Sequence, residues 1–119
     1  MDGKADRLQY RQLLARYATE LSSVAPLVKS SRGEKALAEY QAAFKGLTDL
    51  DLVWEEKDTR GLEMLPIREA LPARIAREYE LGVNTNEPPS IYAGEALATI
   101  RETARRHLRA ASVALGSGP

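Results

Sequence analysis

At 119 residues the chain has the usual length of one domain, and its 44% hydrophobic and 29% charged residues are typical of a globular protein and argue against disorder. Its 17 lysine and arginine residues balance its 17 aspartate and glutamate residues, so no overall charge attracts nucleic acid or an anionic membrane. The chain has no cysteine, which excludes disulfides, thiolate zinc sites and a cysteine nucleophile.

The first predicted helix covers residues 6–29. Apolar side chains recur at spacings of four and three from Tyr10 to Val28, which is the pattern of a helix with one buried face. Pro26 has no amide hydrogen to donate, so we expect this helix to bend or end near Ala25.

The second predicted helix covers residues 32–47, with a short extension to residue 56. Ser31 and Glu34 fit a capping box, in which each side chain satisfies an amide that the first helical turn leaves without a partner. The apolar period slips after Leu47, which indicates a bent continuation or a separate short helix.

The third predicted helix covers residues 62–81 and contains two prolines. Pro66 suits a first helical turn, whereas Pro72 predicts a kink or a break between two shorter helices. Residues 82–89 combine glycine, asparagines and adjacent prolines, and this composition predicts a loop.

The last predicted helix covers residues 90–115, begins at a Ser90 cap and has the most regular apolar seam of the chain. No segment shows the sustained alternation of apolar and polar residues that is typical of a strand. The sequence therefore predicts an all-α protein in which residues 1–119 form a single domain, an antiparallel bundle of about four helices with an irregular or kinked middle.

His107 lies on the seam of the last helix and is the only histidine. At this position we expect a core-edge histidine bound to a carboxylate or carbonyl, although an inward histidine also suits a general base. Together with Arg101 it forms an Arg-x5-His pattern, which resembles the catalytic pattern of the HEPN superfamily of small helical ribonucleases. The resemblance implies that Arg101 and His107 would engage the scissile phosphate and the 2′-hydroxyl of RNA. Glu102 follows the arginine where that family usually has a polar residue, and its charge opposes RNA binding.

Two segments carry opposite charge. Residues 49–63 hold six carboxylates and two cations, whereas the chain from residue 101 onward holds four arginines and one glutamate. Cations near a helix C-terminus oppose the macrodipole, which is one explanation of the basic end; an acidic partner is the other. The acidic spacing is not that of a calcium loop, and the Glu-x-x-His pair of di-iron bundles is absent, so we expect neither a metal nor a cofactor.

The leading functional hypothesis is a non-catalytic helical protein–protein interaction module, such as an adaptor, an assembly factor or an accessory subunit of a larger complex. A protein partner or self-association is expected, and nucleic acid is not. Charged residues of both segments and one tryptophan, a residue enriched at interface hot spots, are the candidate contacts. These residues are Trp54, Glu55, Glu56, Arg101, Arg105 and Arg109.

Two alternatives stay open. One is a HEPN-like ribonuclease that uses Arg101 and His107, and the other is a bundle that holds an apolar small ligand between helices opened by prolines. No apolar run approaches the roughly 20 residues that a bilayer crossing needs, so no membrane span is expected. The cytoplasm is the default compartment, and a mature organellar or exported form stays open.

Overall fold

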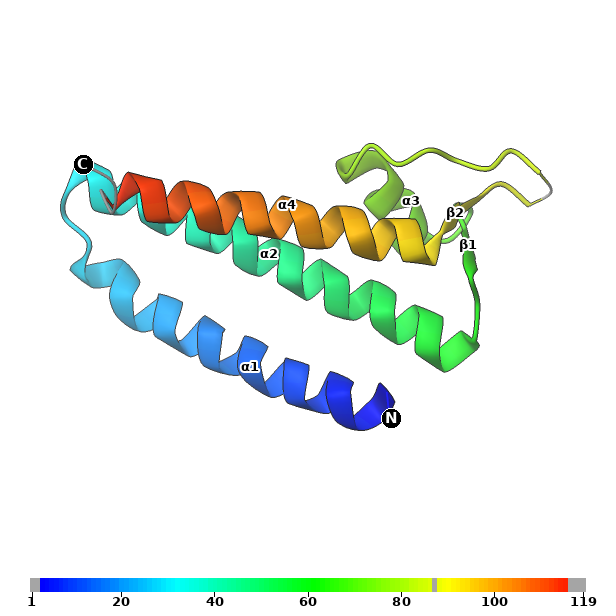
Figure 1. Ribbon diagram of the computed structural model, residues 1–119, viewed down its shortest axis with the longest axis horizontal. Coiled ribbons are helices and arrows are strands. Elements are labelled where there is room, and N and C mark those ends of the chain that lie inside the picture. The colour runs from blue at the N-terminus through cyan, green and yellow to red at the C-terminus, as the bar shows by residue number, and fades with distance from the viewer. Residues whose placement is uncertain (1–2, 87, 116–119) are drawn as a thin grey trace. The chain divides into compact units, whose positions relative to one another are not determined.

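The computed structural model describes residues 3–86 and 88–115, with side chains from residue 6 onward. Figure 1 shows the order of its elements along the chain. They are α1 (Gly3–Val24), the 3-10 turn η1 (Ala25–Leu27), α2 (Ser31–Arg60), β1 (Met64–Pro66), α3 (Ala70–Glu78), β2 (Ser90–Tyr92) and α4 (Ala93–Ala114). The predicted all-α helical fold is confirmed.

The chain divides into two compact units. Unit 1 takes the residues up to Thr48 and those from Glu102 onward, and unit 2 takes Asp49–Arg101. Helices α2 and α4 therefore each contribute to both units. In the described part of the chain, no helix combines the length and the apolar character that a membrane crossing requires.

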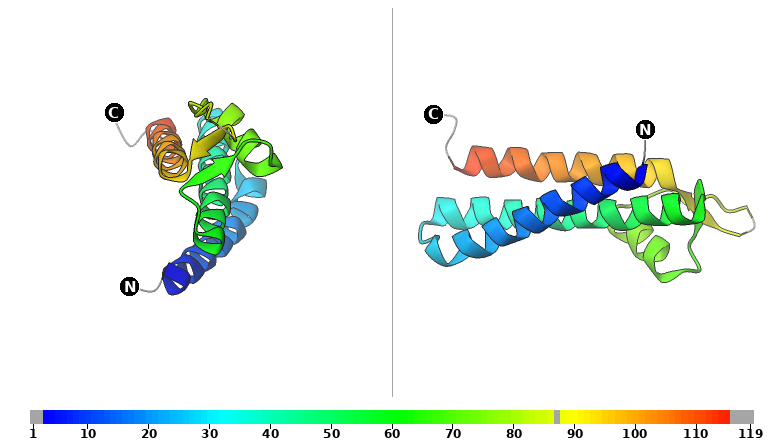
Figure 2. Two further views of the ribbon diagram at one scale, coloured as in Figure 1. Left: turned by 90° about the vertical axis from the view of Figure 1, so that its right-hand side faces the viewer. Right: turned by 90° about the horizontal axis from the view of Figure 1, so that it is seen from below.

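In unit 1, the first half of α2 lies between α1 and the end of α4 (Figures 1 and 2). Two tyrosines join α1 to α2, because the hydroxyl of Tyr10 donates to the carbonyl of Leu47 at 2.6 Å and that of Tyr17 donates to the carbonyl of Tyr40 at 2.9 Å. The ring of Tyr17 also packs on Phe44, with 5.4 Å between ring centroids. Aromatic rings thus fill the space between these two helices, and their polar ends stay satisfied.

Small residues line the contact between α2 and α4 in unit 1. A Cβ added at Gly46 would lie 3.4 Å from the Cβ of Ala104, so the two backbones approach closely at this point. Ala36, Ala43 and Ala111 are also buried. Because this seam carries only small side chains, the backbones of α2 and α4 lie close together.

Unit 2 contains a two-stranded antiparallel sheet. Its register pairs Met64 with Tyr92, Leu65 with Ile91, and Pro66 with Ser90. The fully buried side chains of this unit come from both strands and from the adjoining helices. They include Val53, Leu65, Pro72, Ile75, Ile91 and Ile100.

The helix ends near Pro26 differ from those predicted. Helix α1 ends at Val24 rather than near residue 29, since Pro26 falls in η1. The cap of α2 is Ser30 rather than Ser31: the amide of Gly33 donates to Ser30 Oγ at 2.9 Å. The predicted N-cap therefore lies one residue after the observed one.

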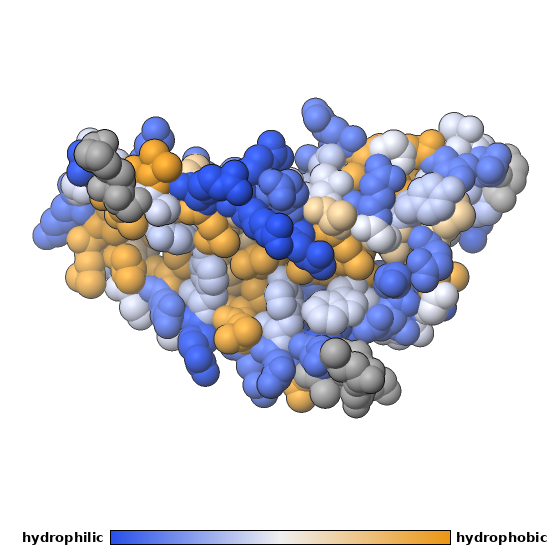
Figure 3. Space-filling model, in the orientation of Figure 1, coloured by the Kyte–Doolittle hydropathy of each residue, from blue (hydrophilic) through white to orange (hydrophobic). Residues whose placement is uncertain are grey.

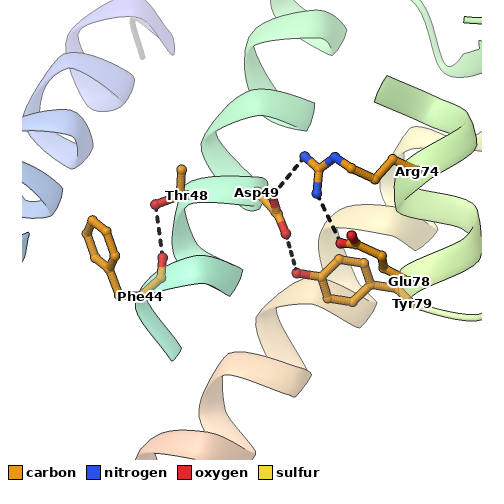
Figure 4. Close-up of polar contacts among 6 residues, drawn as sticks. All are labelled: Phe44, Thr48, Asp49, Arg74, Glu78 and Tyr79. Carbon is orange, nitrogen blue, oxygen red and sulfur yellow. Dashed lines mark hydrogen bonds and ion pairs between the residues drawn. The ribbon is translucent and has the colours of Figure 1, made fainter. Parts of the chain in front are cut away.

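Helix α2 is longer than predicted, since it runs without interruption to Arg60 instead of ending at residue 47 with an extension to 56. Thr48, at the apparent break, keeps helical geometry, and its hydroxyl donates to the carbonyl of Phe44 at 2.9 Å (Figure 4). This bond within the helix satisfies the polar side chain without ending the helix.

The predicted kinked helix over residues 62–81 is wrong. Met64–Pro66 form strand β1, and only Ala70–Glu78 are helical. Pro72 causes no kink, because it lies in the first turn of α3, where its missing amide hydrogen has no partner to lose.

The last helix begins later than predicted. Ser90 does not cap it but pairs with Pro66 in the sheet, and its hydroxyl donates to the carbonyl of Pro88 at 2.9 Å. Helix α4 starts at Ala93, whose amide donates to the carbonyl of Glu63 at 2.8 Å. The expectation that the chain would form no strand is corrected by β1 and β2.

Candidate interaction surface

An open cleft of about 330 Å³ lies in unit 1, and we call it the apolar cleft. Nearly all of its lining side chains are apolar or aromatic. They are Tyr17, Glu20, Leu21, Val24, Val28, Gly33, Ala36, Leu37, Tyr40 and Leu115. Val24 and Leu115 remain 49% and 51% exposed, so apolar side chains of the cleft face solvent in the isolated chain. In Figure 3, apolar surface gathers where α1 ends and α2 begins.

The turn between α1 and α2 shapes the apolar cleft. After η1 the amide of Val28 donates to the carbonyl of Ala25 at 3.3 Å, and the chain then enters α2 at the Ser30 cap. A Cβ at Gly33 would lie 2.9 Å from Ser30 Oγ and 3.1 Å from Val28 Cγ1. The missing side chain therefore lets Val28 lie directly against the first turn of α2.

A second depression of unit 1 lies between the start of α2 and the end of α4, and we call it the basic groove. Three of its lining residues are cations and three are apolar. Its lining residues are Lys35, Arg106, Arg109, Ala110, Val113 and Ala114. Val113 is 70% exposed. In Figure 3 a band of hydrophilic side chains over α4 borders apolar surface.

The apolar cleft and the basic groove border on consecutive residues of the same two segments. Ala36 and Leu115 line the cleft, whereas Lys35 and Ala114 line the groove. Consecutive residues of a helix point about 100° apart, so the cleft and the groove face different sides of α2 and α4.

The predicted contact residues are divided between the two units. Arg109 lines the basic groove and Arg105 is exposed nearby on α4, whereas Arg101 is an exposed residue of unit 2. Trp54 and Glu55, also in unit 2, are half-buried in α2, and each takes part in an interaction within the structure.

The acidic segment is largely engaged with the chain itself. Glu56 Oε2 lies 3.3 Å from Arg60 Nη1, and Glu63 Oε1 lies 3.9 Å from Lys57 Nζ. Asp49 is only 3% exposed and is bound to Arg74. The remaining carboxylates of the segment each take part in an interaction: Asp51, Glu55 and Asp58. Every carboxylate of this segment therefore takes part in an interaction within the structure.

Asp49 is the centre of a polar cluster in unit 2 (Figure 4). Arg74 Nη2 donates to its Oδ1 at 3.0 Å, and the Tyr79 hydroxyl donates to its Oδ2 at 2.7 Å. The other guanidinium nitrogen, Nη1, donates to Glu78 Oε2 at 3.0 Å. Arg74 thus neutralises a buried carboxylate. Its partners raise the pKa of the guanidinium, chiefly through the hydrogen bond to Asp49.

Tyr79 makes the cluster sensitive to alkaline pH. Burial raises the pKa of the phenol above its ordinary value, and the hydrogen bond to Asp49 raises it further. The unfolded phenol ionises first as the pH passes about 10, so this contribution to stability is intact below pH 10 and declines above it.

We expect Tyr79→Phe to lose about 1.5–3 kcal/mol of unfolding free energy at pH 8, because one hydrogen bond to a buried carboxylate disappears. Between pH 8 and pH 11 its stability should decline less than that of the wild type. Urea unfolding at the two pH values measures both effects. Equal declines would contradict the role assigned to the phenol.

His107 lies in unit 1 with its Nδ1 2.6 Å from Glu39 Oε2. Because a carboxylate only accepts, we assign the proton to Nδ1. Both side chains are partly exposed, at 37% and 27%. This arrangement agrees with the expected core-edge histidine bound to a carboxylate. The HEPN-like role of Arg101 and His107 stays a prediction.

The sequence did not single out Lys35, Val113 or the walls of the apolar cleft. Lys35 lies 71 residues before Arg106, and only the fold brings them into one groove.

Within residues 3–86 and 88–115, no three histidine, cysteine or acidic side chains form a group that could hold a metal ion. Scans against protein-family models, curated proteins and solved structures found no match to the chain.

Proposed function

We propose that this protein is a helical protein–protein interaction module whose apolar cleft binds the apolar face of an amphipathic helix from a partner protein. The observation that carries the proposal is the cleft itself, with side chains such as Val24 and Leu115 half-exposed along it. Covering apolar surface of this kind with a partner is favourable by roughly 25 cal/mol for each Å² removed from water.

The form of the cleft favours a helix over a small apolar ligand. Small-ligand sites typically bury about 70–90% of the ligand surface, whereas the walls of this cleft are open to solvent on one side. A helix in a groove needs only one of its faces covered, and its apolar residues at spacings of three and four meet a line of apolar wall residues. Leu21, Val24 and Val28 of this chain supply such a line.

The experiment places a photo-crosslinking amino acid at Leu115, at the edge of the cleft, in native cells. We expect a reproducible crosslink to one segment of a partner protein, with apolar residues at helical spacing. Adding Val24→Asp should reduce the yield at least about tenfold, because the partner would have to bury a carboxylate against apolar side chains.

Val83→Asp is the matched control. Val83 is also a partly exposed valine, but it lies in unit 2 and lines neither the cleft nor the groove. With Val83→Asp, the crosslink from position 115 should form in the same yield as without this substitution. An unchanged yield in Val24→Asp would contradict the proposal, and so would a crosslinked or co-purified apolar small molecule in place of a protein.

A further inference from the structure

The apolar cleft contains one charged side chain. Of the described residues that line it, Glu20 alone carries a charge, and Glu20 is exposed. It lies on α1 three residues after Tyr17 and four before Val24, which are the spacings that place helix residues on one face. Both of those residues also line the cleft. A helix that fills the cleft therefore lies beside the carboxylate of Glu20.

The fold does not use this carboxylate. In the part of the chain that the structure describes, no cation pairs with Glu20. Arg16 stands four residues earlier on α1, but it is exposed and forms no ion pair with Glu20, and this order of charges is the less favourable one on a helix. Glu20 also lies just before the last turn of α1, where the negative end of the macrodipole gives a carboxylate no stabilisation. Neither an ion pair within the chain nor helix electrostatics therefore accounts for an acidic residue at this position.

Filling the cleft changes the environment of Glu20. The other side chains of the cleft are apolar or aromatic, so an occupant would replace water around the carboxylate with apolar surface. An ionised carboxylate that loses water without gaining a partner costs free energy, and the same loss of water strengthens a pair with a cation. The cations of the basic groove do not line the cleft. The compensating charge is therefore expected from the occupant.

Resting on the function proposed above, we infer that the partner helix carries a lysine or arginine at the border of its apolar face, and that this cation pairs with Glu20. The rings of Tyr17 and Tyr40, which also line the cleft, suit the same residue. Its aliphatic stem packs on apolar surface, and its cationic head is attracted to aromatic faces. Charges at the border of an apolar contact set partner choice more than total affinity. Glu20 is thus the specificity-determining residue of the cleft.

The test uses three synthetic helical peptides of about 18 residues, with leucines at spacings of three and four. Their flanking positions are all lysine, all glutamine or all glutamate. Fluorescence anisotropy gives Kd for the full chain at about 50 and about 300 mM salt. We expect the lysine peptide to bind at least about threefold tighter than the glutamine peptide at low salt, and the glutamate peptide to bind most weakly. The advantage of lysine should shrink at high salt, because salt screens the pair.

Glu20→Gln should remove the lysine advantage without weakening the binding of the glutamine peptide, because the side chain keeps its shape and loses only its charge. Glu20→Lys should reverse the order, so that the glutamate peptide binds tighter than the lysine peptide. Glu102→Gln is the matched control, with the same change at an exposed glutamate of unit 1 that lines neither the cleft nor the groove. It should keep the preference for lysine. Circular dichroism checks that all three variants keep their helices.

The outcomes separate this inference from the proposed function. Lysine and glutamine peptides that bind equally, with binding lost in Val24→Asp, would overturn the basic partner and leave the interaction module standing. A lysine advantage that persists in Glu20→Gln would overturn the role of Glu20 in the same way. No binding of any of the three peptides would overturn both. A dimer of the chain alone that Glu20→Lys abolished would overturn a partner protein as the occupant and assign the cleft to a second copy.

Discussion

Replacing Arg74 with alanine is expected to lower the free energy of unfolding by about 2–3 kcal/mol. The variant removes the cation that faces the buried carboxylate of Asp49, and breaking a fully buried ion pair typically costs about 3–5 kcal/mol. Solvent reaches part of the Arg74 side chain and screens the pair, so the expected loss of about 2–3 kcal/mol is below that range. Denaturant unfolding followed by circular dichroism measures the change.

Arg77→Ala is the control for this prediction, because Arg77 is exposed on the same helix, α3. Its stability should change by no more than about 0.5 kcal/mol. Adding Asp49→Asn to Arg74→Ala should recover part of the loss, since the uncompensated charge is then gone. Equal stability losses in Arg74→Ala and Arg77→Ala would show that Asp49 does not depend on its guanidinium partner.

Gly46→Val is expected to destabilise the protein by about 1–3 kcal/mol. A Cβ at this position already meets the Cβ of Ala104 at 3.4 Å, so two further methyl groups would force α2 and α4 apart. Gly46→Ala adds only the tolerated atom and restores helix propensity, so it should be neutral or stabilising by up to about 1 kcal/mol. Thermal and denaturant unfolding measure the stability of both variants, and only Gly46→Val should lose stability.

Gly94→Val serves as the matched control, because a Cβ at Gly94 meets nothing within 4 Å. Its cost should be well below that of Gly46→Val. Comparable losses at both glycines would indicate that valine itself, rather than the approach of α2 to α4, is responsible.

The helical class could be predicted because the apolar period of three and four is a local property. The continuity of α2 was missed because the prediction followed its bulky residues, such as Leu37 and Phe44, which are half-buried. The fully buried seam runs through Ala43 and Gly46 to Leu50 and Val53, at helical spacing. Alanine and glycine give little hydrophobic signal, so this seam escaped notice.

The sheet could not be predicted, because its stability depends on pairing between distant segments. Strand β1 includes Pro66 and strand β2 begins at Ser90, and each strand is only three residues long. Three residues are too few to show an alternating pattern, and serine before an apolar run is typical of a helix cap. The pairing of Leu65 with Ile91 buries both side chains and outweighs that local preference.

The candidate interaction surface was predictable only in part. Arg109 was expected at a contact because of its charge, and it lines the basic groove. Neither Lys35 nor the apolar cleft could be inferred, since both depend on how α1, α2 and the end of α4 pack. Exposed apolar residues of α1 such as Val24 look in sequence like ordinary members of a buried helical stripe.

The most direct test of the interaction module is a titration of isotope-labelled protein with a synthetic helical peptide, followed by backbone amide chemical shifts. The peptide has about 18 residues, with leucines at spacings of three and four and glutamines at the flanking positions. The peptide carries no charge at its flanking positions, so it probes the apolar cleft alone. The account predicts that the largest shifts cluster at cleft residues, including Leu21, Val24, Leu37 and Leu115, and that Val24→Asp removes them. Saturating peptide with no shifts at these residues, or shifts confined to unit 2, would contradict it.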